Sequence, residues 1–221
     1  MKPYELVLFD LDGTLVDTAA EITDTVNDTL ARFDLPAVTE ARATRWIGHG
    51  TRELLVQALA AQGQAGTAMV RSADALRLAS ATFDAAYRQR CGTRSRLYPR
   101  VRETLHALRE RGTRIGLVTN KEARYAERVL AAHALSPLFD ITIFGDTLPT
   151  KKPDPAGVVA CLDRFGLFRD QALFVGDSSI DVATARAAAL TVWAVPYGYN
   201  AGRPIELHAP DRVIPDIGAL V

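Results

Sequence analysis

Short, mostly apolar runs that alternate with helical segments are the feature that most limits the folds open to this chain. Five such runs, four or five residues long, occupy residues 6–9, 114–118, 141–144, 172–175 and 191–195. Strands buried on both faces of a parallel sheet have this continuous apolar character. Between the later runs lie segments with helical periodicity, at residues 100–110, 122–133, 154–165 and 179–188. This alternation predicts an α/β protein with a doubly wound, Rossmann-like parallel sheet, to which residues 212–214 add a short last strand.

The segment between residues 18 and 95 interrupts this alternation. It contains no convincing buried strand, and its periodicity predicts amphipathic helices at residues 20–33, 52–61 and 68–90. We therefore expect a helical cap at residues 18–95, inserted into an α/β catalytic core formed by residues 1–17 and 96–221. A connection of this length inside a compact domain is usually functional, often as a lid over a site.

Composition and charge limit the classes of function. Hydrophobic residues make up 48% of the 221 residues and charged residues 24%, which is typical of a globular protein. The 26 basic and 26 acidic side chains cancel, so neither a nucleic acid nor an anionic membrane is an expected partner. Cys91 and Cys161 lie far apart without a CxxC spacing, and neither a signal peptide nor a membrane span is found. We expect a soluble cytoplasmic protein with reduced thiols.

The first apolar run ends in Asp10-Leu11-Asp12-Gly13-Thr14, which carries the strongest chemical signal. Two carboxylates on a turn that leaves a buried strand can converge on one centre, and Gly13 permits the tight turn. One of them can attack phosphorus, while the other protonates the leaving oxygen and later activates water. Aspartate and glycine are also common in ordinary surface turns, but the position after a buried strand favours a catalytic interpretation of Asp10 and Asp12.

Two further strands lead to groups suited to binding an anion. Thr119, Asn120 and Lys121 stand where the second strand meets a helix. A hydroxyl and backbone N–H groups can cradle a phosphate there, although an ordinary helix cap has the same appearance. Lys152 is followed by two prolines that stiffen the chain, and a fixed ammonium offsets the charge of a phosphoryl group. The neighbouring Lys151 is expected to be merely solvated.

The fourth run leads to Gly176-Asp177-Ser178-Ser179-Ile180-Asp181, which suits a metal ion. Mg²⁺ prefers oxygen ligands, takes few protein carboxylates and keeps several waters. Asp177 can meet Asp10 and the backbone carbonyl of Asp12 around such an ion. Asp181, one turn into the next helix, and Thr14 are expected to order the surroundings of the metal. An acidic residue in a first helical turn also complements the helix dipole, and both roles can hold together for Asp181.

Taken together, these motifs resemble the haloacid dehalogenase superfamily, in order and spacing, over essentially the whole chain. The resemblance implies that Asp10 is the nucleophile and Asp12 the general acid and base. It further implies that Thr119 and Lys152 bind the phosphoryl group. Mg²⁺ would be held by Asp10, Asp12 and Asp177. True dehalogenases lack the second aspartate, so Asp12 favours phosphoryl transfer over dehalogenation.

Finer features, at residues 46–50, 197–200 and 210–214, resemble the phosphoglycolate phosphatases of that superfamily. The resemblance implies hydrolysis of 2-phosphoglycolate, a small phosphorylated metabolite, to glycolate and phosphate. The sequence leaves open whether the protein is a monomer or a homodimer. In that family the insertion closes over the active site, and a loop with Gly48 and Gly50 faces the substrate. Arg52 is a further candidate partner for a substrate carboxylate. His49 stands where the family commonly has asparagine, which leaves the substrate preference open.

Two alternatives stay open from the sequence. A phosphatase or mutase for another small metabolite, such as a sugar phosphate, would share every core residue. A non-catalytic regulatory protein on the same fold is the alternative from a different class. Against a nucleotide-binding module, the chain lacks GxxxxGK[ST], and residues 48–53 lack the third glycine and the preceding strand of the dinucleotide fingerprint.

Overall fold

The computed structural model describes residues 4–221, and a six-stranded sheet forms its centre. Neighbouring strands all run parallel, in the order β5-β4-β1-β6-β7-β8. The strands are β1 Leu6–Phe9, β4 Arg114–Val118, β5 Ile141–Ile143, β6 Ala172–Gly176, β7 Thr191–Ala194 and β8 Arg212–Val213. This topology confirms the predicted doubly wound α/β fold. It also places the carboxyl ends of β1, β4 and β6 next to one another, where open sheets of this class bind ligands.

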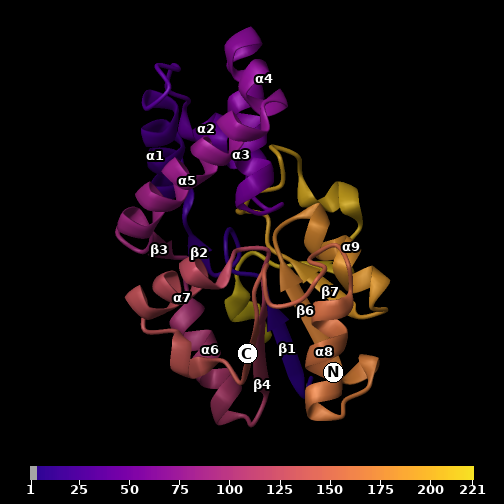
Figure 1. Cartoon of the computed structure of the whole chain (residues 1–221). Helices are drawn as coiled ribbons and strands as arrows, with labels where there is room; N and C mark the ends of the chain where they lie inside the picture. Colours follow the sequence, from indigo (N-terminus) through magenta and orange to yellow (C-terminus); the bar gives the residue numbers. More distant parts are fainter. Residues whose placement is uncertain (1–3) are drawn as a thin grey trace.

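Helices cover both faces of the sheet. In Figure 1, α6 Val101–Glu110 and α7 Ala123–Ala132 lie on one side of the strands, and α8 Ala156–Phe165 and α9 Ser179–Ala187 lie on the other. Short 3-10 helices occupy Thr44–Trp46, Ser136–Leu138, Arg169–Gln171, Ile205–His208 and Ile217–Leu220. Among residues 4–221, no helix combines the length and apolar character needed to cross a membrane.

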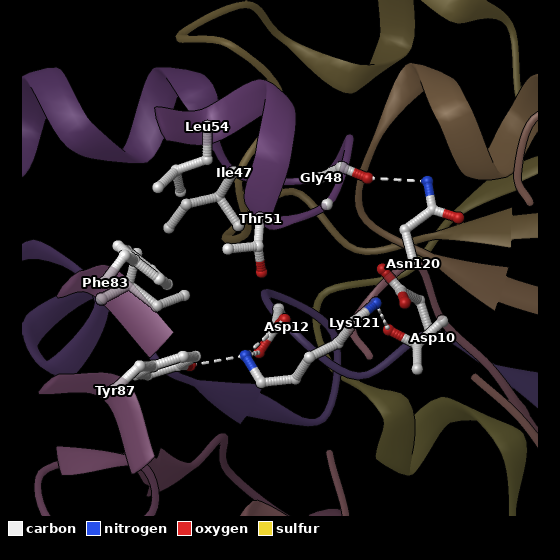
Figure 2. A pocket seen from close by; sticks show the side chains of 13 residues that line it. Asp10, Asp12, Ile47, Gly48, Thr51, Leu54, Phe83, Tyr87, Asn120 and Lys121 are labelled. Carbon is white, nitrogen blue, oxygen red and sulfur yellow. Dashed lines mark hydrogen bonds and ion pairs between the residues drawn. The ribbon is translucent and has the colours of Figure 1, made fainter. Parts of the chain in front are cut away.

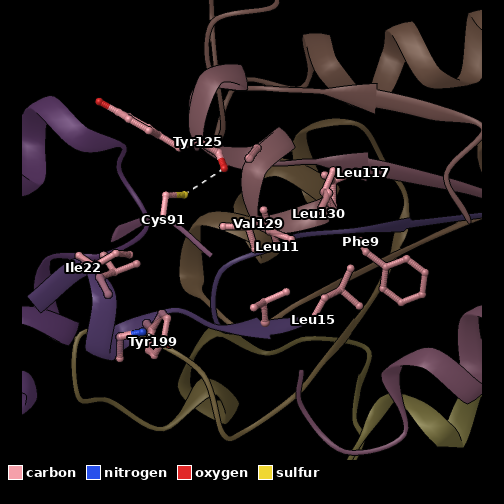
Figure 3. Close-up of a cluster of buried hydrophobic side chains, with 14 of the residues drawn as sticks. Phe9, Leu11, Leu15, Ile22, Cys91, Leu117, Tyr125, Val129, Leu130 and Tyr199 are labelled. Carbon is pink, nitrogen blue, oxygen red and sulfur yellow. Dashed lines mark hydrogen bonds between the residues drawn. The ribbon is translucent and has the colours of Figure 1, made fainter. Parts of the chain in front are cut away.

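The side chains of β1 explain why this strand is central. All four are at most 2% exposed, because successive side chains of a strand point to opposite faces and both faces are covered. Leu6 and Leu8 pack in the cluster with residues of α8 and α9. Val7 and Phe9 pack in the cluster with residues of α6 and α7, part of which is drawn in Figure 3. The strand is thereby fixed in place, and so is the residue that follows it.

Residues 18–95, all of which the structure describes, form helices and no strand. The α-helices are α1 Ala19–Ala31, α2 Glu40–Ala43, α3 Thr51–Ala60, α4 Gly63–Arg71 and α5 Ala73–Arg90. The insertion is flanked by β2 Val16–Asp17 and β3 Arg96–Leu97, which pair antiparallel, Val16 opposite Leu97. In Figure 1 these helices lie above the carboxyl ends of the sheet strands. The division into a core and a cap at these residues stays a prediction.

One helix expected from the sequence is two helices in the structure. The periodicity predicts a single helix over residues 68–90, whereas α4 ends at Arg71 and α5 begins at Ala73. Ser72 has an extended backbone, with φ −92° and ψ 113°, and its Oγ accepts a hydrogen bond from the backbone N–H of Ala75 at 3.3 Å. Serine is favoured at such an N-cap, and this local bond interrupts a pattern that is otherwise continuous.

A buried carboxylate of α1 holds the chain that returns from the insertion to the sheet. Glu21 is 0% exposed. Its Oε2 accepts hydrogen bonds from the backbone N–H groups of Gly92, Arg94 and Ser95, at 2.9, 3.3 and 3.1 Å. Burial raises the pKa of Glu21, although these backbone bonds favour its charged form. Glu21 therefore fixes the segment between α5 and β3.

Replacing Glu21 with alanine removes the acceptor of three backbone N–H groups. We expect Glu21→Ala to lower the free energy of unfolding by about 1–3 kcal/mol, because three partly buried backbone N–H groups lose the acceptor they share. Glu21→Gln keeps an acceptor oxygen in the same position, so its free energy of unfolding should fall clearly less. Urea unfolding followed by circular dichroism measures both variants. A Glu21→Ala protein as stable as the unmodified chain would contradict this role.

Candidate active site

The predicted acidic residues gather at the carboxyl end of β1. Asp10 follows the strand directly, and its backbone N–H bonds the carbonyl of Val175 at 3.0 Å, which extends the sheet pairing by one residue. Asp12 lies across a turn in which Gly13 has φ +88°. A Cβ on Gly13 would lie 2.4 Å from Oδ2 of Asp177, so this turn requires glycine. Asp10 and Asp12 both line the pocket drawn in Figure 2.

Lys152 supplies a buried ammonium to this group. The residue is 5% exposed, and its Nζ lies 2.8 Å from Oδ1 of Asp10 and 2.6 Å from Oδ1 of Asp181. Burial favours the neutral amine, but the charges of Asp10 and Asp181 outweigh burial and raise the pKa of Lys152. A charged ammonium is therefore held directly against Asp10.

Asp181 is oriented by the start of α9. Its Oδ2 accepts hydrogen bonds from the backbone N–H groups of Asp177 and Ser178, at 3.1 and 3.0 Å, and from Oγ of Ser178 at 2.7 Å. Ser178 is the N-cap of α9, so the two side chains form a capping box at the positive end of the helix. Both oxygens of Asp181 have partners, and its position next to Lys152 holds the ammonium in place. The expected role at the helix N-terminus is confirmed, and the role of Asp181 in ordering the surroundings of a metal stays a prediction.

Asp177 lies at the carboxyl end of β6 and is 2% exposed. Its Oδ1 accepts a hydrogen bond from Oγ1 of Thr14 at 2.6 Å, and its Oδ2 accepts one from the backbone N–H of Tyr199 at 2.6 Å. Thr14 therefore contacts an acidic residue of the site. Carboxylate oxygens of Asp10, Asp177 and Asp181 lie within 4.8 Å of one another.

Three carboxylates buried at this separation destabilise one another's charge. Burial raises the pKa of Asp10 to about 6, although Lys152 acts in the opposite direction. Burial, and then the charges of Asp181 and Asp10, raise the pKa of Asp177 well above its usual range. Within the described residues, Oδ1 of Asp10 has no hydrogen bond of good geometry beyond its ion pair with Lys152. An acidic cluster of this kind suits a divalent cation.

The side chain of Asp12 turns away from this cluster toward Lys121. Its Oδ1 accepts hydrogen bonds from Oγ1 of Thr18 at 2.8 Å and from Nζ of Lys121 at 3.1 Å, and its Oδ2 lies 3.0 Å from the same Nζ. Lys121 also donates to the hydroxyl of Tyr87 in α5, at 2.6 Å. Thr18 and Lys121 therefore engage the carboxylate of Asp12, and a role for its backbone carbonyl at the acidic cluster stays a prediction.

Thr119 and Asn120 follow β4, are buried, and line the pocket. The hydroxyl of Thr119 accepts a bond from the backbone N–H of Lys121 at 3.3 Å. Nδ2 of Asn120 donates to the carbonyls of Gly48 and Lys152, at 2.9 Å each. Asn120 thereby ties the insertion to the loop that carries Lys152.

The loop of the insertion that reaches the sheet contains two glycines. Gly48 and Gly50 line the pocket and have φ +121° and +87°. Lys151, for which the sequence predicts only solvation, donates from Nζ to the carbonyl of His49 at 2.6 Å and so anchors this loop. The side chains of His49 and Arg52 are exposed, and neither residue lines the pocket. The structure therefore lends no support to substrate contact by His49 or Arg52.

Lys121 and Tyr87 are site residues that the sequence analysis did not assign. Lys121 belongs to the segment Thr119-Asn120-Lys121, for which the sequence predicts an anion cradle, but no role was predicted for its ammonium. Tyr87 lies within a predicted helix and carries no local pattern that separates it from packing residues. Four apolar side chains complete the wall on the insertion side, namely Ile22, Ile47, Leu54 and Phe83.

Comparison with known proteins finds relatives that match nearly the whole chain. A model of the haloacid dehalogenase-like hydrolases matches residues 7–195. The chain is 39% identical over 219 residues to a phosphoglycolate phosphatase of Mannheimia succiniciproducens, covering 99% of this chain and 97% of that one. It is 39% identical over 216 residues to phosphoglycolate phosphatase 1 of Pseudomonas aeruginosa, covering 98% and 78%. The crystal structure of a predicted phosphoglycolate phosphatase from Haemophilus somnus superposes with a TM-score of 0.93 at 33% identity, covering 100% and 97%.

Gly50, in the loop of the insertion, and Gly63, the first residue of α4, give a paired test of this loop. Alanine at either position meets a positive φ and should lose about 1–2 kcal/mol of stability from backbone strain. A Cβ at Gly50 would also lie 2.7 Å from Nζ of Lys151, whereas one at Gly63 meets nothing within 4 Å. Gly50→Ala should therefore lower the free energy of unfolding by a further ~1 kcal/mol, because the added Cβ displaces Lys151 and breaks its hydrogen bond to His49.

Urea unfolding and amide hydrogen exchange measure this difference. Exchange at residues 47–51 should be faster in Gly50→Ala than in Gly63→Ala. Equal stability and equal exchange of the two variants would show that Lys151 does not anchor the loop.

Proposed function

Because this chain belongs to the haloacid dehalogenase-like hydrolase family and is a phosphatase, we propose that it hydrolyses 2-phosphoglycolate to glycolate and phosphate. The observation that carries the chemistry is the pair of carboxylates at the end of β1, with the ammonium of Lys152 2.8 Å from Asp10. The substrate is supported by the names of relatives that match nearly the full chain. The buried free thiols of Cys91 and Cys161 support a reducing compartment, and we propose the cytoplasm.

The proposed nucleophile is Asp10. Its carboxylate attacks phosphorus, the bond from phosphorus to the substrate oxygen breaks, and the departing alkoxide takes a proton from Asp12. Water then attacks the aspartyl phosphate and gives its proton to Asp12, which releases phosphate and restores Asp10. The proximity of the two residues on one turn supports these paired roles. Lys152 and Thr119 would offset and orient the charge of the phosphoryl group.

The proposed cofactor is Mg²⁺, held by the carboxylates of Asp10 and Asp177 and by the backbone carbonyl of Asp12. The raised pKa values of Asp10 and Asp177 support this assignment, because a bound cation would stabilise both charged forms. Asp181 bonds the ammonium of Lys152 through Oδ1 and would orient it. When bound, Mg²⁺ supplies positive charge that stabilises negative charge on the phosphoryl oxygens.

Phosphate release from a panel of phosphoesters tests the substrate and the metal together. The panel contains 2-phosphoglycolate, sugar phosphates, nucleotides and pyrophosphate, each assayed with Mg²⁺ and with EDTA. We expect release to need Mg²⁺, and kcat/KM to be at least about tenfold higher for 2-phosphoglycolate than for the other compounds, a difference of ~1.4 kcal/mol.

The outcomes separate the parts of the proposal. Preference for a sugar phosphate would contradict the substrate and leave the aspartate chemistry standing. Full activity in EDTA would contradict the metal. No release from any compound would contradict the proposed hydrolysis.

A further inference from the structure

The pocket contains a buried ammonium that the proposed chemistry at phosphorus does not use. Lys121 is 6% exposed, and among the described residues that line the pocket its side chain is the cationic one. Its Nζ lies 3.0 Å from Oδ2 of Asp12 and 2.6 Å from the hydroxyl of Tyr87. Figure 2 shows this Nζ pointing across the pocket toward the insertion, between Asp12 and Tyr87.

The two buried lysines divide the site into two parts. Lys152 contacts Asp10 and Asp181, on the side where the phosphoryl group would bind. Lys121 contacts Asp12, which would protonate the leaving oxygen. A group attached to that oxygen by one or two bonds would therefore lie near Lys121, and a negative charge on it would face the ammonium.

The rest of the wall on the insertion side favours a small leaving group. Ile22, Ile47, Leu54 and Phe83 are apolar, and the polar side chains that this side contributes to the pocket are those of Thr51 and Tyr87. A sugar would bury several hydroxyl groups here with few partners, at a cost for each one left unpaired. A short carboxylic acid would place its charge at Lys121. Because a phenol hydroxyl both accepts and donates, Tyr87 could bond the same carboxylate while accepting from Lys121.

We propose that Lys121, assisted by the hydroxyl of Tyr87, binds the carboxylate of a short phosphorylated hydroxy acid and so selects the substrate. The assignment rests on the proposed function and names the residue that would give it its specificity. It differs from the expectation that Arg52 binds this carboxylate, since Arg52 is exposed and outside the pocket. The ion pair with Asp12 fixes Lys121 before substrate binds, so little side-chain freedom is lost on binding.

The test compares two substrates that differ in the carboxylate. These are 2-phosphoglycolate and 2-hydroxyethyl phosphate, in which a neutral hydroxymethyl group replaces the carboxylate. Lys121→Met removes the charge and keeps an unbranched side chain. We expect the ratio of kcat/KM between the two substrates to fall on the order of 100-fold, as when one partner of a buried charge pair is removed. Damage that acts only through Asp12 would lower both rates together and leave the ratio unchanged, which would overturn the proposal.

Further variants make the result independent of how Lys121→Met folds. Tyr87→Phe removes one oxygen and should lower the same ratio about tenfold, the effect of one hydrogen bond to a charged group. Lys151→Met is the matched control. Nζ of Lys151 bonds the backbone carbonyl of His49, and Lys151 does not line the pocket, so this variant should leave the ratio of kcat/KM between the two substrates unchanged. An unchanged ratio in both Lys121→Met and Tyr87→Phe would exclude this role.

Inhibition of the unmodified enzyme gives a measurement that needs no variant. Glycolate should compete with substrate, and ethylene glycol at the same concentration should not; equal inhibition by the two would contradict a carboxylate site.

The unmodified enzyme also separates the two proposals. Failure to prefer 2-phosphoglycolate would overturn the proposed function, whereas a preference that survives Lys121→Met would overturn the assignment to Lys121 alone.

Discussion

The ion pair between Lys152 and Asp10 is the interaction on which the rest of the site depends. The packing of β1 on both faces carries Asp10 into a buried position, where a lone carboxylate is strongly disfavoured. Even with the ammonium of Lys152 at 2.8 Å, burial holds the pKa of Asp10 at about 6. Burial and the charges of Asp181 and Asp10 also raise the pKa of the neighbouring Asp177 well above its usual range. The burial that makes this cluster of carboxylates unfavourable alone also makes it suited to a divalent cation.

The position of Lys152 is linked to the insertion through short polar contacts. Asp181 holds its ammonium, while Asn120 bonds both the carbonyl of Lys152 and that of Gly48. The hydroxyl of Thr51 also donates a hydrogen bond to the carboxylate of Glu122 at 2.7 Å, and Glu122 lies shortly after the carboxyl end of β4. The insertion is therefore held over the pocket by residues adjacent to the proposed chemistry. Asn120 thus links the loop at Gly48 to the backbone of Lys152, so the position of the insertion and that of Lys152 depend on each other.

The sheet and the acidic cluster could be predicted from the sequence because both depend on local patterns. Apolar runs ending in aspartate marked β1 and β6, and the order of the motifs brought Asp10, Asp12 and Asp177 to one edge. The break at Ser72 and the burial of Lys121 could not be predicted, because a single local cap or a tertiary partner decides each of them. The exposure of Arg52 could not be predicted either, because helical periodicity does not say which face of a helix meets the pocket.

The most direct test of the account is whether Asp10 carries a phosphoryl group during turnover. The enzyme is quenched in acid while it hydrolyses 2-phosphoglycolate with Mg²⁺, and the peptide that contains Asp10 is examined by mass spectrometry. The account predicts one added phosphoryl group on Asp10, absent in Asp10→Asn and retained when the exposed Asp163 is changed to Asn. A phosphoryl group on another residue, or an Asp10→Asn protein with near-normal turnover, would contradict it.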